Sequence, residues 1–123
     1  MSKYEMREKF FFEKLTIYQR SLAFSVKICQ LASNFPVKYQ RVQNQIIGAA
    51  ISVPLNIAEG SGRRFIKEKI NFFNISRASL FECVPLLEIC KSLELINEDN
   101  FIKLTEEAVE ISKMINSFVS KIH

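Results

Sequence analysis

Apolar residues recur along the chain at the three- and four-residue spacing of an α-helix, in four separate segments. This spacing predicts helices over about residues 15–34, 39–59, 64–93 and 101–122. The chain holds only three Gly and three Pro, too few turn residues for the corners of a β-sandwich or barrel. Connections of about four residues make consecutive helices antiparallel neighbours. The sequence therefore predicts an all-α fold, an antiparallel up-down-up-down four-helix bundle.

The last segment has the most regular pattern. Its apolar residues follow strict three- and four-residue steps: Phe101, Leu104, Ala108, Ile111, Ile115, Phe118 and Ile122. Three carboxylates, Glu106, Glu107 and Glu110, fall off this stripe. They could in principle bind a metal, but a solvated outer face is the favoured interpretation. We expect no metal site and no cofactor.

The second segment contains residues that resist helix formation. An interior Gly costs roughly 1 kcal/mol against Ala and an interior Pro about 3 kcal/mol. We therefore expect another backbone to approach closely at Gly48, and a kink or turn break near Pro54. Gly60 is placed for a left-handed C-cap, and Pro85 is expected to kink the third helix.

The third segment is apolar on two sides. One stripe is interrupted by a single arginine: Ile66, Ile70, Phe73, Arg77, Leu80, Val84 and Leu87. The other apolar residues form a second face: Phe65, Phe72, Ile75, Cys83, Leu86 and Cys90. Such a helix either lies centrally in its domain or meets a second subunit. Since no helix of a four-helix protein is wholly central, we favour a subunit contact.

Arg77 needs a partner if it is buried, because an unpaired buried charge costs several kcal/mol. Glu59 is one of only two acids between Lys14 and Arg77. We therefore predict that Asn56 and Glu59 face Arg77 in a structural polar cluster. An active-site role for the three residues is the less favoured alternative.

The length of 123 residues fits one domain, placed at residues 14–123 after an N-terminal extension of residues 1–13. Three cysteines, Cys29, Cys83 and Cys90, lie on apolar stripes without metal-binding spacing, and we expect buried free thiols in a reducing compartment. No apolar run is long enough to span a membrane, and no signal peptide is expected. A bacterial-type cytoplasmic location is the default.

Charge is unevenly distributed along the chain. The net charge is +4, from 17 Lys and Arg against 13 Asp and Glu, and no acid occurs between Lys14 and Ala58. Four cations open the third helix, where the helix dipole makes cations mildly unfavourable: Arg63, Arg64, Lys67 and Lys69. With exposed backbone N–H groups close by, they make a candidate phosphate cradle. Arg41 on the second helix joins the candidate nucleic-acid contacts, and a solvated charged face is the alternative.

Catalytic chemistry is not indicated. The only histidine is His123 at the end of the sequence, where acid–base chemistry lacks a positioned group. The sequence contains no nucleophile-elbow, phosphate-loop, zinc-protease or di-iron carboxylate pattern. We therefore expect no enzyme.

The segment from Ser52 to Gly60, which reads Ser-Val-Pro-Leu-Asn-Ile-Ala-Glu-Gly, resembles the signature of the four helix bundle proteins. These are also called the large-subunit (23S) ribosomal RNA intervening-sequence protein family. The resemblance extends over about residues 10–120, including Phe35-Pro36 and the segment from Ser76 to Leu80. Asn56, Glu59, Gly60, Arg63 and Arg77 match signature positions.

This resemblance implies an antiparallel four-helix bundle that assembles as a ring-like homopentamer. A related branch serves as the accessory protein of diversity-generating retroelements and binds nucleic acid. The present sequence departs from the family pattern by lacking an arginine pair at Ile47-Gly48, and Tyr18, Lys38 and Ala78 replace commoner residues. The missing arginines weaken the expectation of nucleic-acid binding but leave fold and assembly unaffected.

The sequence thus favours a non-enzymatic pentameric bundle that binds RNA or DNA through phosphate contacts. A protein-interaction scaffold, whose unidentified partner carries the nucleic-acid chemistry, is the alternative. An enzyme built in the bundle core is the least favoured possibility.

Overall fold

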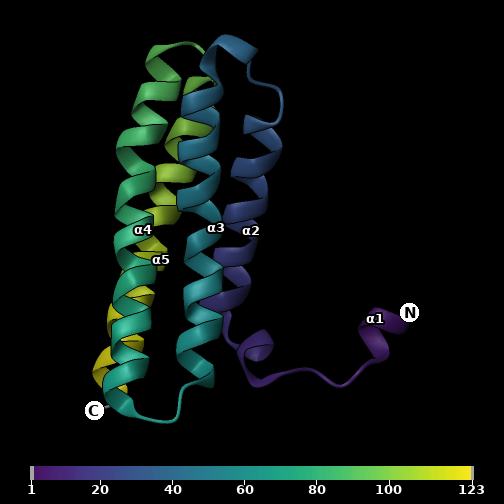
Figure 1. Ribbon diagram of the computed structural model, residues 1–123, viewed down its shortest axis with the longest axis vertical. Coiled ribbons are helices and arrows are strands. Elements are labelled where there is room, and N and C mark those ends of the chain that lie inside the picture. Colours follow the sequence, from purple (N-terminus) through teal and green to yellow (C-terminus); the bar gives the residue numbers. More distant parts are fainter. Residues whose placement is uncertain (1, 123) are drawn as a thin grey trace.

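Four long helices form the body of the protein in the computed structural model, which describes residues 2–122 (Figure 1). They are α2 (Thr16–Ala32), α3 (Gln40–Gly62), α4 (Ile66–Ser92) and α5 (Glu98–Lys121). Three shorter elements accompany them: α1 (Lys3–Met6) and the 3₁₀ turns η1 (Phe11–Lys14) and η2 (Val37–Tyr39). No strand occurs within residues 2–122.

The long helices pack as an antiparallel bundle. α3 lies between α2 and α4, while α5 contacts α4 and α2 and so closes the bundle (Figure 1). Short connections force consecutive helices to run in opposite directions, as in the three-residue link between Gly62 and Ile66. The predicted all-α, up-down-up-down four-helix bundle is confirmed.

The core is built from the inner stripes of all four helices. Leu104, Ala108, Ile111 and Ile115 of α5 are buried, as the regular spacing predicts. Phe73 of α4 is buried too, and its ring meets Phe118 edge to face with centroids 5.2 Å apart. Burying one such side chain contributes about 1.5–3 kcal/mol, so these stripes hold the bundle together.

The glycines of α3 differ from the expectation. Nothing lies within 4 Å of a Cβ built at Gly48, so no backbone approaches there. A Cβ at Gly60 would instead lie 3.1 Å from Phe72 Cβ and 3.2 Å from the carbonyl oxygen of Lys69. Gly60 is therefore a position of close packing between α3 and α4, inside the helix and without a positive φ.

The left-handed cap is found at the end of α4 instead. Glu94 has a φ of 60°, and its N–H donates to the carbonyl of Lys91. The N–H of Leu95 donates to the carbonyl of Cys90 at 2.8 Å, which completes a Schellman motif. The prediction of a left-handed C-cap at Gly60 was wrong because α3 runs two residues further, to Gly62.

Both internal prolines lie inside unbroken helices. α3 continues through Pro54 and α4 through Pro85, so the turn break considered near Pro54 does not occur. Next to Pro54, the buried hydroxyl of Ser76 donates to the carbonyl of Val53 at 2.7 Å. This bond joins α3 to α4 beside the proline.

The second apolar face of α4 is divided. Cys83, Leu86 and Cys90 are buried within this chain, since α4 packs against both α3 and α5. Phe65 and Ile75 are exposed. The prediction that this whole face waits for a second subunit was therefore wrong for its C-terminal half.

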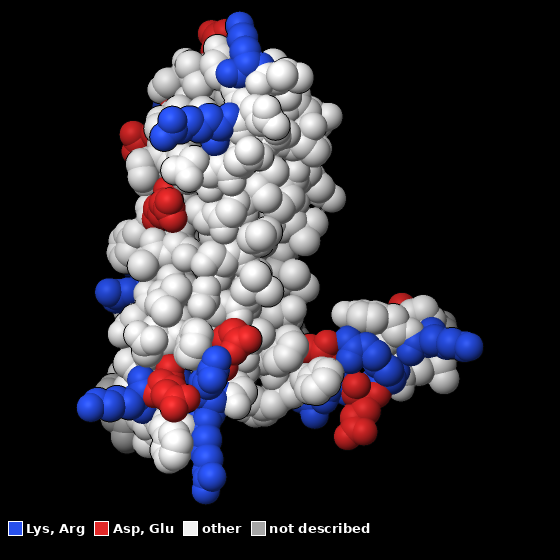
Figure 2. Space-filling model, viewed as in Figure 1, with Lys and Arg blue, Asp and Glu red and all other residues white. Residues whose placement is uncertain are grey.

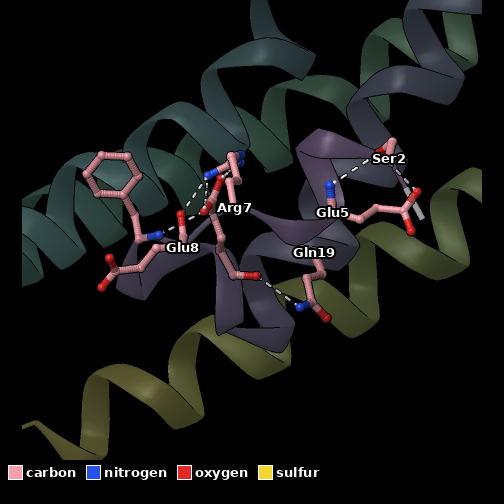
Figure 3. A network of polar contacts seen from close by, with 7 residues as sticks. Ser2, Glu5, Arg7, Glu8 and Gln19 are labelled. Atoms are coloured by element: carbon pink, nitrogen blue, oxygen red, sulfur yellow. Dashed lines mark hydrogen bonds and ion pairs between the residues drawn. The ribbon is translucent and has the colours of Figure 1, made fainter.

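The segment before the bundle extends away from it, apart from its η1 turn, which packs against α2 and α3. Residues 2–14, which we call the arm, leave the lower end of α2 and carry α1 to one side (Figure 1). A polar network shapes the base of the arm, where Arg7 forms an ion pair with Glu13 (Figure 3). Glu13 also accepts from the backbone N–H of Phe10 at 2.8 Å, and its carbonyl accepts from Gln19 at 3.0 Å.

Among residues 2–122, no helix is both long enough and apolar enough to cross a bilayer.

Candidate nucleic-acid interface

Four cations gather where α3 passes into α4. Arg63 and Arg64 lie in the connection, and Lys67 and Lys69 lie in the first turns of α4. All but Lys69 are exposed. The helix begins at Ile66, two residues later than predicted, so the two arginines precede its N-terminus.

Two of these cations are held by their own chain. Arg63 pairs with Glu59 at 3.0 Å and lies over the Phe72 ring at 4.6 Å from its centroid. The ammonium of Lys69 donates to the carbonyl of Ser61 at 3.1 Å.

The charged groups of Arg64 and Lys67 are less engaged by neighbouring residues than those of Arg63 and Lys69. Arg64 lies over the Phe65 ring at 5.7 Å, and neither cation forms an ion pair within residues 2–122. They are therefore the two side chains best able to contact an anion.

The N-terminus of α4 adds backbone donors. Its N-cap residue is Phe65, and no side chain caps the first turn. The first N–H groups of a helix lack intrahelical partners and carry the positive end of the helix dipole. Glu68 lies in the same turn and opposes an anion. The local balance is four cations against Glu59 and Glu68, which leaves a positive surface suited to phosphate.

Arg41 does not belong to this group. It lies in the first turn of α3, whereas Arg63 follows the last, and 22 residues of helix span about 33 Å. The structure thus brings together four of the five predicted nucleic-acid contacts and leaves Arg41 at the opposite end of the bundle.

The predicted polar cluster does not form. Arg77 donates to the side-chain oxygen of Asn116 at 2.6 Å and lies over the Phe81 ring. Glu59 is paired with Arg63, and no ion pair joins Glu59 to Arg77 in the described chain. The prediction failed because Arg77 is only partly buried and reaches a polar residue of α5.

Asn56 has different partners. Its amide nitrogen donates to the carbonyl oxygen and the hydroxyl of Ser52, at 2.8 and 2.9 Å. The Ser52 hydroxyl accepts from Ser79 of α4 at 2.8 Å. A small hydroxyl–amide cluster therefore links α3 to α4 where the predicted charged cluster was placed.

A family model for the 23S rRNA-intervening sequence protein matches residues 13–117. The chain belongs to the 23S rRNA-intervening sequence protein family. A similar solved structure is that of a protein with unknown function from the S23 ribosomal protein family of Bacteroides thetaiotaomicron. It is 26% identical with a TM-score of 0.76, and the match covers 85% of this chain and 98% of that one. No curated protein sequence matches the chain.

This family member also carries an apolar groove that the sequence reasoning missed. The groove lies between α2 and α3, has a volume of about 720 Å³, and is lined by twelve residues without a charge. They include Tyr18, Leu22, Val26, Cys29, Ile51 and Leu55. Figure 2 shows charges near the ends of the molecule and along its α4 edge, whereas most of its α2 and α3 side is white.

A signal for the groove was present in the sequence. The first predicted helix has two apolar stripes, and the bundle buries only the one containing Ile17, Phe24 and Ile28. The other, with Leu22 and Val26, stays exposed beside α3.

The cysteines and carboxylates do not form a metal site in the described residues. Cys83 and Cys90 are buried thiols, and burial raises their pKa to about 12 and about 11, so they stay protonated at neutral pH. Cys29 is only half-buried, at the groove. Glu107, one of the carboxylates considered as a ligand, pairs with Arg20 of α2. His123 lies outside the described residues.

Proposed function

We propose that this protein is a non-catalytic helical scaffold that assembles with copies of itself and binds the phosphate backbone of structured RNA or DNA. Its contact surface is the cationic end, defined as Arg63, Arg64, Lys67, Lys69 and the uncapped N-terminus of α4. No base-reading element accompanies these cations, so phosphate contacts would position the ligand without reading its sequence. A cytoplasmic location is part of this proposal.

The observation that carries the proposal is the gathering of exposed cations on an uncapped helix N-terminus. Membership of a family named for the 23S rRNA intervening sequence supports the choice of nucleic acid. Assembly as a pentamer, which the resemblance implies, would bring five such ends together. Weak sites then act jointly through their effective concentration.

The first test is the salt dependence of binding to duplex RNA and duplex DNA of equal length. Phosphate contacts release counterions, so the logarithm of the affinity should fall linearly with the logarithm of salt concentration. The double variant Arg64→Ala/Lys67→Ala removes two contacts. Its slope should be shallower than that of the native chain by roughly 1.4–1.8, at about 0.7–0.9 per contact.

The matched control is Lys103→Ala/Lys113→Ala on α5. These lysines are exposed and paired with Asp99 and Glu110, so the control loses the same charge elsewhere on the molecule. It should bind with nearly the native slope. Equal weakening in both double variants would mean that net charge alone drives binding, which contradicts the assigned surface.

Arg41→Ala tests the opposite end of the bundle. A single additional phosphate contact would lower the slope by about 0.7–0.9, and an unchanged slope would remove Arg41 from the interface. No retention of either nucleic acid at about 50 mM salt, where phosphate contacts are strong, would favour the protein-interaction scaffold instead.

A further inference from the structure

The arm carries large apolar side chains that its own chain does not cover. Tyr4, Met6, Phe10 and Phe11 are each 65–70% exposed. A monomer usually leaves single apolar side chains exposed, but four within eight residues form a patch. Such a segment is expected to bind an apolar surface.

The groove between α2 and α3 offers that surface. Its exposed apolar residues include Val26 of α2 and Leu55 of α3, and no charged residue lines it. The groove itself therefore buries no charge when the four arm side chains enter it, and the charged residues between them, such as Glu5 and Lys9, stay at its rim.

The dimensions of arm and groove agree. The groove extends along α2 from Tyr18 to Ser33, which is about 22 Å of helix. One helical turn at residues 3–6 and four extended residues at 7–10 span about 20 Å. The arm is thus long enough to lie along most of the groove.

The part of the arm that precedes its η1 turn is directed away from the groove of its own chain. Phe12 lines the lower end of that groove, and the chain then bends outward at residues 7–13 (Figure 1). The Arg7–Glu13 pair and the Phe10–Glu13 hydrogen bond hold this bend (Figure 3). Folding back would break these contacts, so a second copy is the better-placed acceptor.

We infer that the arm of one copy docks in the α2–α3 groove of another copy. Aromatic side chains bury about 150–250 Å² each, so covering Tyr4, Phe10 and Phe11, which are two-thirds exposed, together with Met6 removes roughly 500 Å² from the arm. A similar area of the groove gives roughly 1,000 Å² in total, the lower limit of a specific interface. Because arm and groove are different surfaces, the contact is head-to-tail and can close a ring. This inference rests on the self-assembly in the proposed function.

Thiol crosslinking tests the contact directly. Met6→Cys places a reactive thiol on the arm, and the native Cys29 supplies one in the groove. Cys83 and Cys90 are buried and protonated, so they should not react with a short bis-maleimide. A head-to-tail contact should give a ladder of covalent dimers, trimers and larger species, and Cys29→Ser in the same background should abolish it.

Other products would overturn the inference. Bands that persist with Cys29→Ser would mean that arms meet each other. A crosslink confined to single chains would mean that the arm occupies its own groove. Dimers without larger species would exclude the head-to-tail ring.

A matched pair of substitutions separates this inference from assembly itself. Ile51→Lys places a charge in the groove, and the control Ile102→Lys places the same charge on α5, outside the groove. The two isoleucines match in exposure, at 42% for Ile51 and 45% for Ile102. Ile51→Lys should raise the concentration needed for assembly at least about tenfold, whereas Ile102→Lys should not. Helicity should be native in both variants.

If the native chain assembles but neither the ladder nor the Ile51→Lys effect is observed, only the arm contact is wrong. If the native chain stays a single molecule at every concentration, the assembly in the proposed function fails as well.

Discussion

The outer surface of α5 differs from the outer surface of α2 and α3 in how much apolar area it leaves exposed to solvent. α5 buries its apolar stripe inside the bundle and exposes charged residues such as Lys103 and Glu110. α2 and α3 also bury an apolar stripe, yet they expose a second one that lines the groove. α5 thus exposes apolar residues such as Ile102 and Val109 among its charged ones, whereas α2 and α3 together expose a continuous apolar groove without a charge.

The largest expected effect separates the two surfaces by stability. Ile111→Ala on α5 removes a fully buried side chain and should lower the free energy of unfolding by about 2–5 kcal/mol at any protein concentration. Leu55→Ala in the groove, where the side chain is 60% exposed, should cost under about 1 kcal/mol in dilute solution. Chemical denaturation at several protein concentrations measures both. A dilute Leu55→Ala chain as unstable as Ile111→Ala would remove the distinction.

A smaller effect is expected from the two faces of α3 itself. Gly60→Ala forces a Cβ against Phe72 and the Lys69 carbonyl and should destabilise the protein by about 1–3 kcal/mol. Gly48→Ala meets nothing within 4 Å and should stabilise it by about 0.5–1 kcal/mol through better helix propensity. Thermal unfolding followed by circular dichroism should shift in opposite directions. Shifts of the same sign would mean that the packing of α3 is assigned incorrectly.

The smallest expected effect concerns the base of the arm. The hydrogen bond from Arg7 holds the pKa of Glu13 below its ordinary value of 4.5. The network is therefore complete above that value and is lost as the pH falls through the lower native pKa. The amide resonance of Phe10, which donates to Glu13, should move on acidification, and Glu13→Gln should reproduce that change at pH 7. If the Phe10 amide resonance stays in place both on acidification and in Glu13→Gln, Glu13 does not hold the bend.

The fold could be predicted from the sequence because its signal is periodic and local. The strict spacing of apolar residues from Phe101 to Ile122 predicts the helix α5, and the scarcity of turn residues predicts the all-α class. Short connections then fix the antiparallel topology.

Side-chain partners between different helices could not be predicted, because they depend on how the helices are rotated against one another. Arg77 is such a case, since it reaches Asn116 of α5. Glu59 is not, because its partner Arg63 follows four residues later, a helical spacing that the sequence itself shows. The sequence also predicted that the second apolar face of α4 contacts another subunit, although packing of α4 against both α3 and α5 buries half of that face. The second apolar stripe of α2, with Leu22 and Val26, was the feature of the sequence that indicated the groove.

Sedimentation equilibrium of the native chain over a wide range of concentrations tests the central claim most directly. The claim is that the α2–α3 side is covered by another copy. For the native chain, the account predicts a mass that rises with concentration to about 72 kDa, five times the 14.3 kDa of one chain. For Ile51→Lys, it predicts a lower mass at the same concentration. A mass of 14.3 kDa at every concentration would contradict it.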